Sequence, residues 1–279
     1  MFYFSLIPMN IFIGSSLSAD AMTIATSFLF CAIIFRHINK PKVSSQFKFL
    51  LLFLGIFIAL SKLAYLPILI AIFLIPSKTL NLTWKLSIVL FSALTAIFWS
   101  LMVKDIYLPC LEYVNLYNQL QFILTNPVKF ISAMFSPFDR LLQLPGSFTA
   151  NFGWLDTPTN KCFIVYYLLL GLFVIRLENV EGVVSKSRKN ISVFIIVSNY
   201  VLINLLIYLS WNKIGEDRVE GIQGRYFLPL IPIVIFCLSR LKNKKTADIV
   251  FKNRPIFLPL SIIISQIYCL LVMYLRYYV

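Results

Sequence analysis

The sequence predicts an all-α membrane protein, a polytopic bundle of about eight or nine transmembrane helices. Hydrophobic residues make up 59% of the chain and charged residues 13%, with a mean hydropathy of +0.85. A soluble globular protein has roughly 45–50% apolar and about 25% charged residues. Apolar runs recur along the whole chain without the alternation of a barrel, and in lipid such runs must satisfy their own backbone as helices. These observations exclude a soluble enzyme, a disordered chain and a disulfide-built secreted module.

Nine apolar segments are candidates for the spans: residues 3–16, 20–36, 47–61, 64–77, 86–103, 161–176, 191–209, 225–239 and 256–275. Several fall short of the roughly 20 residues that a perpendicular span needs, so we expect a bundle with thinned or tilted edges. Residues 47–77 form either one long helix or a hairpin folded at Ser61 and Lys62. A single helix would be about 46 Å long against a hydrocarbon core of about 30 Å, which favours the hairpin.

The distribution of charge supports the same choice and orients the chain by the positive-inside rule. With the hairpin, 16 of the 25 Lys and Arg residues fall on the cytoplasmic side and 9 on the outer side. Only 3 of the 11 acidic residues lie inside. The net charge of +14 is therefore mainly a topology signal, assisted by anionic lipid headgroups, and no nucleic-acid partner is expected.

The chain is expected to form one membrane-embedded domain over residues 1–279, and the longest stretch without a span is 104–160 on the outer side. Within it, Asn126 is a good N-cap and Pro127 a good first helical residue. Two short amphipathic helices lying on the outer membrane surface are predicted here. The apolar positions at helical spacing after Pro127 are Val128, Ile131, Met134 and Phe135.

The first polar candidate is Asp20, which follows Ser18 directly before a predicted helix. One interpretation is structural: Ser18 caps the helix and Asp20 complements the helix dipole in the first turn. The other is catalytic, with the Asp20 carboxylate at the membrane–water boundary as a general base or as a ligand of a sugar hydroxyl. The two interpretations are compatible.

Two basic residues lie at other helix ends on the same side. Lys62, at the hairpin tip, is either an interfacial anchor or a point charge for a lipid phosphate, and the cost of a cation in a tight apolar turn favours the phosphate. Arg225 offers a planar fork for bidentate phosphate binding, and Gly224 beside it permits close backbone approach. Gln223 and Tyr226 complete this predicted substrate-binding motif. The alternative is an Arg and Tyr belt at the interface.

A fourth motif ends the long outer loop. Asp156 is a second candidate base or sugar ligand, and Trp154 a candidate platform for a sugar ring. The alternatives are that Asp156 caps the next helix and that Trp154 anchors at the interface. The nearby acidic residues Glu216, Asp217 and Glu220 are interpreted as a solvated loop.

Asp20, Lys62 and Arg225 are all predicted on the outer side of the membrane. This shared location is more informative than any one of the three residues alone. At three separate helix ends they are placed to converge on one phosphate-bearing headgroup. No cofactor is predicted; a divalent metal is compatible with the site, but no pair of carboxylates requires one. Asn199 and Asn204, within a predicted span, are expected to form hydrogen bonds between helices.

Several of these stretches together resemble a known family. In order they are PMNIFIGSSLSADAMTIA, SKLAYLPILIAIFLIPSK, NPVKF, GWLDTP and GIQGRYFLPLIP. This order is similar to a bacterial polytopic membrane-protein family catalogued as domain of unknown function twenty-one forty-two. That family looks related to the GT-C glycosyltransferases, which use polyprenyl-phosphate sugars on the extracytoplasmic side. The resemblance places Asp20 at the family's SxDA position, Lys62 at its K-x-x-YLP position and Arg225 at its QGRY position.

The resemblance implies a GT-C-like transferase in the bacterial cytoplasmic membrane, with a polyprenyl-phosphate sugar or another lipid-linked glycan as partner. A transporter or flippase component for lipid-linked sugars is the alternative. A third interpretation follows from a departure from the pattern. GT-C proteins keep an acidic motif in the first outer loop, whereas this chain begins inside a later helix, as expected of an inactive truncated copy.

Overall fold

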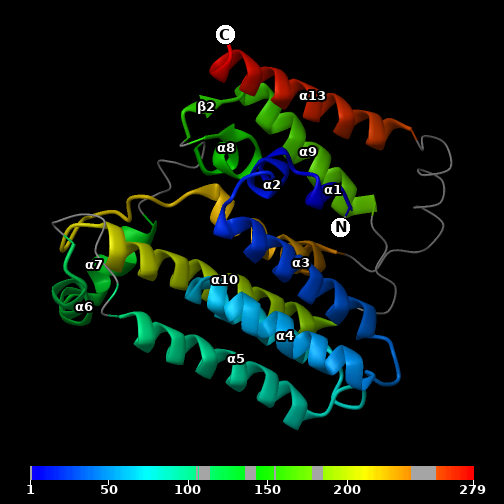
Figure 1. Ribbon diagram of the computed structural model, residues 1–279, viewed down its shortest axis with the longest axis vertical. Coiled ribbons are helices and arrows are strands. Elements are labelled where there is room, and N and C mark those ends of the chain that lie inside the picture. Colours follow the sequence, from blue (N-terminus) through cyan, green and yellow to red (C-terminus); the bar gives the residue numbers. More distant parts are fainter. Residues whose placement is uncertain are drawn as a thin grey trace.

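The computed structural model describes residues 2–104, 106, 114–135, 143–153, 155–177, 185–239 and 256–279. In these ranges the chain is helical apart from connecting turns and one two-stranded hairpin (Figure 1). Four of the described helices, α3, α5, α10 and α13, are long and apolar enough to cross a membrane. The prediction of an all-α transmembrane bundle is confirmed at this level.

The first third of the chain contains α1 (Phe2–Ser5), α2 (Pro8–Gly14), α3 (Ala19–His37), α4 (Ser45–Ser61), the 3₁₀ helix η1 (Leu63–Leu74) and α5 (Leu82–Val103). The middle third contains α6 (Leu116–Thr125), α7 (Pro127–Phe135), α8 (Gln143–Thr149), the strands β1 (Asn151–Phe152) and β2 (Thr157–Pro158), and α9 (Lys161–Leu177). The last third contains α10 (Lys186–Trp211), the 3₁₀ helix η3 (Gly224–Leu230), α11 (Ile231–Leu238) and α13 (Phe257–Tyr277).

Each predicted apolar segment coincides with helix, but prolines divide or shorten several of them. The predicted span at 3–16 is divided into α1 and α2, and Pro8 is the first residue of α2. The predicted span at 225–239 is divided into η3, which contains Pro229, and α11. A proline has no N–H for the α-helical hydrogen bond and clashes with the preceding turn. As a result, the described part of the chain has fewer full-length α-helices than the number of predicted spans.

The predicted break at Ser61 and Lys62 is confirmed, since α4 ends at Ser61 and η1 begins at Leu63. Thr79, beyond the end of η1, accepts a hydrogen bond from the Val43 N–H (3.3 Å) and donates one to the Lys40 carbonyl (2.8 Å). The two arms therefore run antiparallel. The second arm is unexpectedly 3₁₀, with Pro67 inside it. Because 3₁₀ geometry rises about 2.0 Å per residue, twelve residues reach about 24 Å instead of about 18 Å.

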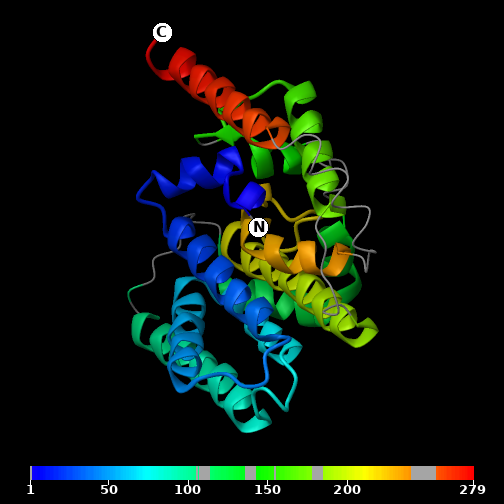
Figure 2. The same ribbon diagram turned by 90° about the vertical axis from the view of Figure 1, so that its right-hand side faces the viewer.

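Most of the helices form two halves, and both α11 and α3 contribute side chains to the cores of the two. Helices α3, α4, α5 and α10 pack together with η1, whereas α1, α2, α8, α9 and α13 form the other half (Figures 1 and 2). Ile233 and Phe236 of α11 belong to the first hydrophobic core, and Ile231 and Ile235 to the second. The segment η3–α11, which begins with the QGRY motif, therefore lies between the two cores.

The contacts agree with the predicted alternation of sides. Each of four hydrogen-bonded pairs joins segments predicted on the same side: Asp20 with Lys62, Lys40 with Thr79, Gln119 with Lys213, and Asp156 with Arg276. The short helices of the long loop are also found, and α7 begins at Pro127. Asn126 does not act as the predicted side-chain cap, because its amide donates backwards to Thr125 (2.9 Å) at the end of α6. Its backbone carbonyl accepts the first bond of α7, from Phe130.

Candidate functional site

The N-termini of three helices meet at one end of the first half of the bundle. One of the predicted charged residues lies in or directly before the first turn of each. Asp20 lies in the first turn of α3, Lys62 directly precedes η1, and Arg225 is the second residue of η3. Lys62 donates a hydrogen bond through Nζ to Oδ1 of Asp20. The structure therefore brings these three predicted residues into one cluster, and with them Tyr226.

Both interpretations of the Ser18–Asp20 motif have a counterpart in the structure. Ser18 is the N-cap of α3, and its side chain accepts the backbone N–H of Asp20 at 3.2 Å. The Asp20 carboxylate is then available for the ion pair with Lys62. The Asp20 side chain is 13% exposed and that of Lys62 36%. A half-buried pair of this kind is screened less than a surface ion pair, so it fixes the tip of the hairpin against α3.

Two cations approach the ring of Tyr226. The Lys62 Nζ lies 5.2 Å from the ring centroid and the Arg225 Cζ 5.9 Å from it. The Tyr226 carbonyl accepts a hydrogen bond from the Tyr65 hydroxyl at 2.9 Å, which ties η3 to η1. Within the described part of the chain, Arg225 forms no ion pair, and its Nε is buried without a hydrogen-bond partner. With Asp20 paired to Lys62, the cluster keeps one net positive charge.

Besides these cations, the starts of η1 and η3 offer backbone N–H groups as hydrogen-bond donors. Neither helix has a side-chain cap, since Lys62 and Gln223 at the N-cap positions form no capping hydrogen bond. The first bond of η1 runs from the Tyr65 N–H to the Lys62 carbonyl (3.1 Å), so the N–H groups of Leu63 and Ala64 lie outside the helix's own ladder. Free N–H groups at a helix N-terminus favour bound anions.

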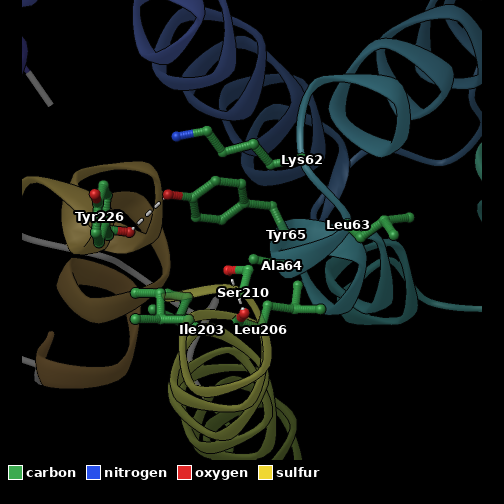
Figure 3. Close-up of a pocket in the computed structure, with 9 residues that line it drawn as sticks. Lys62, Leu63, Ala64, Tyr65, Ile203, Leu206, Ser210 and Tyr226 are labelled. Atoms are coloured by element: carbon green, nitrogen blue, oxygen red, sulfur yellow. Dashed lines mark hydrogen bonds between the residues drawn. The ribbon is translucent and has the colours of Figure 1, made fainter. Parts of the chain in front are cut away.

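A cavity of about 330 Å³ opens beside this cluster (Figure 3). Lys62 and Tyr226 lie at its polar end, and α10 supplies an apolar wall in which Ser210 donates to the Leu206 carbonyl at 2.7 Å. In Figure 3 the Tyr65 hydroxyl points to Tyr226 across the space between η1 and η3. The residues that line the cavity are Lys62, Leu63, Ala64, Tyr65, Ile203, Leu206, Ile207, Ser210 and Tyr226. A polar end with Lys62 in the lining and Arg225 near the ring of Tyr226, facing an apolar wall, suits an amphipathic anion.

Helix α8 holds the QGRY motif in place. The Gly224 N–H donates to the Ser147 hydroxyl at 2.7 Å, and a Cβ on Gly224 would lie 2.0 Å from the Leu144 carbonyl oxygen. The close backbone approach predicted at Gly224 is therefore present, but its partner is α8 rather than a ligand. Gln223 contributes a buried Oε1 that has no hydrogen-bond partner among the described residues.

The other predicted motif lies in a different part of the fold. Asp156 follows β1, and its Oδ2 lies 3.5 Å from Arg276 of α13, with 43% of the Asp156 side chain exposed. The predicted cap of α9 by Asp156 is wrong, because Asn160 accepts the Cys162 N–H at 2.8 Å. Trp154 lies outside the described residues. The role of Asp156 as a base or sugar ligand stays a prediction.

Asn199 and Asn204 differ from expectation. Each is fully buried in α10, and each amide donates at 2.8 Å to the carbonyl four residues earlier in the same helix. The predicted interhelical bonds are absent from the described residues. Across those residues no group of three or more His, Cys, Asp or Glu side chains is placed to hold a metal ion.

The link between Tyr65 and Tyr226 was not predicted. A signal for it exists in the sequence. Both tyrosines follow a basic residue and precede a proline, Pro67 or Pro229, inside an apolar run. That pattern indicates two interrupted helices with polar starts.

Comparison with known proteins gives a match to a family model described as predicted membrane protein (DUF2142), over residues 1–234. The matched region contains the whole cluster around Tyr226. No curated protein and no solved structure matches the chain significantly.

Proposed function

This chain belongs to the DUF2142 family of predicted membrane proteins, and from that premise we propose that it binds the phosphate of a lipid-linked sugar. We place the site on the extracytoplasmic face of the bacterial cytoplasmic membrane, with the shorter helices completing about eight or nine crossings. The chain then acts as a GT-C-like glycosyltransferase in cell-surface glycan assembly. The proposal rests on one observation: Lys62 and Arg225 flank Tyr226 where two uncapped helices begin.

Arg225 is the principal phosphate ligand in this proposal. It has no ion-pair partner among the described residues, and its planar fork matches two phosphate oxygens. The N–H groups of Leu63 and Ala64 add neutral donors at the cavity that Lys62 borders. Each hydrogen bond to a charged group contributes about 1.5–3 kcal/mol, so a phosphate gains most of its affinity from Arg225. The apolar wall on α10 accommodates the first part of the lipid chain.

The proposed reaction is sugar transfer with polyprenyl phosphate as the leaving group. The bond between the anomeric carbon and the phosphate oxygen breaks, and a bond to the acceptor hydroxyl oxygen forms. Arg225 and Lys62 stabilise the negative charge that develops on the phosphate, which is commonly the largest contribution to such a step. As Lys62 moves towards the phosphate, it releases the carboxylate of Asp20, which takes the proton of the acceptor hydroxyl.

A transporter or flippase for lipid-linked sugars would need polar groups near the middle of the membrane. Asn199 and Asn204 are the candidates, but both bond to their own helix and neither lines the cavity beside Lys62. The charged residues of the site lie instead at the helix ends, which favours the transferase. An inactive copy would bind the lipid phosphate without transferring the sugar.

The test uses the purified full chain in detergent with radiolabelled polyprenyl-phosphate glucose and mannose, and a membrane lipid extract as acceptor. We expect transfer from at least one donor, reduced at least about tenfold in Arg225→Gln, since one charged hydrogen bond contributes about 1.5–3 kcal/mol. Arg218→Gln is the matched control, because Arg218 is 55% exposed and pairs with Glu220 at 3.8 Å. Transfer that survives Arg225→Gln, or falls equally in both variants, contradicts the assignment of Arg225.

A further inference from the structure

A second cavity lies beside Ile222, the residue directly before the QGRY motif. It has a volume of about 350 Å³ and is bounded by α8, the β1–β2 hairpin and the start of α9. Ile222 lines this cavity and Tyr226 lines the first one. Four residues span at most about 14 Å of extended chain, so one short segment borders both cavities.

The lining of the second cavity combines polar and apolar groups. Ser147, Asn151, Thr159 and Lys161 contribute polar atoms, among aliphatic side chains that include Ile164. Thr159 is only 6% exposed, and its hydroxyl has no hydrogen-bond partner among the described residues. A buried hydroxyl normally has a partner, because an unsatisfied one costs about 1–3 kcal/mol. Thr159 is one of several residues with an unsatisfied buried polar atom in the described part of the chain, and it is the one of them that lines this cavity, where a ligand with polar groups can supply a partner.

We propose that this second cavity binds a saccharide, which is the acceptor in the transfer proposed above and to that extent rests on the proposed function. A saccharide offers hydroxyl groups to Thr159 and Lys161 and C–H faces to the aliphatic lining. The volume lies within the range of small-molecule sites, roughly 300–1,000 Å³. The Ser147 hydroxyl is already occupied by the Gly224 N–H, so this contact couples the floor of the acceptor cavity to the phosphate site.

Two substitutions separate this cavity from the first. Thr159→Val keeps the shape of the side chain and removes the hydroxyl. Gly146→Leu fills space between α8 and α9, and its Cβ would lie 3.4 Å from Cδ1 of Ile164, an ordinary contact. A thermal unfolding curve for each variant confirms that it is folded.

The experiment is saturation-transfer difference NMR on the purified full chain with four probes, the methyl glycosides of glucose, galactose, mannose and N-acetylglucosamine. We expect at least one glycoside to receive saturation, its affinity to fall about two- to tenfold in Thr159→Val, and binding to be lost in folded Gly146→Leu. Arg218→Gln, at an exposed residue that lines neither cavity, should bind the same glycoside as well as the wild type.

Several results would overturn the proposal. They are the absence of any glycoside signal, a signal that Thr159→Val and Gly146→Leu leave unchanged, and a signal that disappears in Arg218→Gln. Binding of farnesyl phosphate is measured on the same samples. Its failure with glycoside binding intact contradicts the phosphate site and leaves the saccharide site standing, whereas the reverse result overturns the saccharide site alone.

Discussion

Replacing Gly224 by alanine tests how the phosphate site is held in place. The added Cβ would lie 2.0 Å from the Leu144 carbonyl oxygen and 2.5 Å from the Phe148 backbone nitrogen. Both atoms belong to the backbone of α8, so no flexible side chain can yield. Helix α8 and η3 must therefore separate, and the hydrogen bond from Gly224 to Ser147 lengthens or breaks.

The cost follows from these two effects. Overpacking a close contact costs about 1–3 kcal/mol, and a lost hydrogen bond about 0.5–1.5 kcal/mol, giving about 1.5–4.5 kcal/mol in all. For a chain of this size we expect a fall in the melting temperature of roughly 3–18 °C. Intrinsic tryptophan fluorescence during thermal unfolding in detergent measures it. Gly14→Ala is the matched control, because no atom lies within 4 Å of its Cβ position.

The result that would refute this reasoning is equal melting of Gly224→Ala and the wild type. Glycine would then not be required at position 224, and α8 would not position Arg225. Equal destabilisation by Gly14→Ala would also refute it, because the loss would then follow from removing any glycine. A folded but destabilised Gly224→Ala should also bind farnesyl phosphate more weakly, since η3 carries Arg225.

Three further predictions concern the same cluster and its orientation. A double-mutant cycle with Asp20→Asn and Lys62→Gln should give a coupling of about 0.5–3 kcal/mol in unfolding free energy, and additive effects would argue against the ion pair. Tyr65→Phe removes the hydrogen bond to Tyr226 and should cost about 0.5–1.5 kcal/mol in thermal unfolding, so an unchanged melting curve would contradict that link. In a variant whose native cysteines are replaced by serine, because Cys162 is itself free and exposed, Lys213→Cys should react with a membrane-impermeant maleimide added outside intact cells; labelling only after permeabilisation would reverse the proposed topology.

Local signals in the sequence were sufficient where a feature depends on neighbouring residues. The cap of α3 by Ser18, the break at Ser61–Lys62 and the start of α7 at Pro127 all follow from short patterns and span length. The prediction that Asp20, Lys62 and Arg225 lie close together depended instead on the number of basic residues assigned to each side of the membrane. That assignment predicts only a common membrane face, whereas the structure shows which of the residues are in contact.

Other features depend on packing that no local pattern reveals. Asp20 and Lys62 were expected to converge on one headgroup, but their direct ion pair was not predicted, because it depends on how the hairpin packs against α3. The amides of Asn199 and Asn204 bond within α10, because the carbonyl four residues back is always within reach in a helix, whereas a partner on another helix depends on tertiary contacts. The second cavity also depends on tertiary packing, since it joins α8, a hairpin and α9.

The central claim is that Arg225 makes this end of the bundle a phosphate site, and ligand binding tests it most directly. The measurement compares farnesyl phosphate with farnesol, its neutral counterpart, on the detergent-solubilised full chain by microscale thermophoresis. We predict that the wild type prefers farnesyl phosphate and that Arg225→Gln weakens it by about 10- to 150-fold, equivalent to 1.5–3 kcal/mol, without changing farnesol binding. Equal affinity of the wild type for both compounds, or an undiminished preference in Arg225→Gln, would contradict the claim.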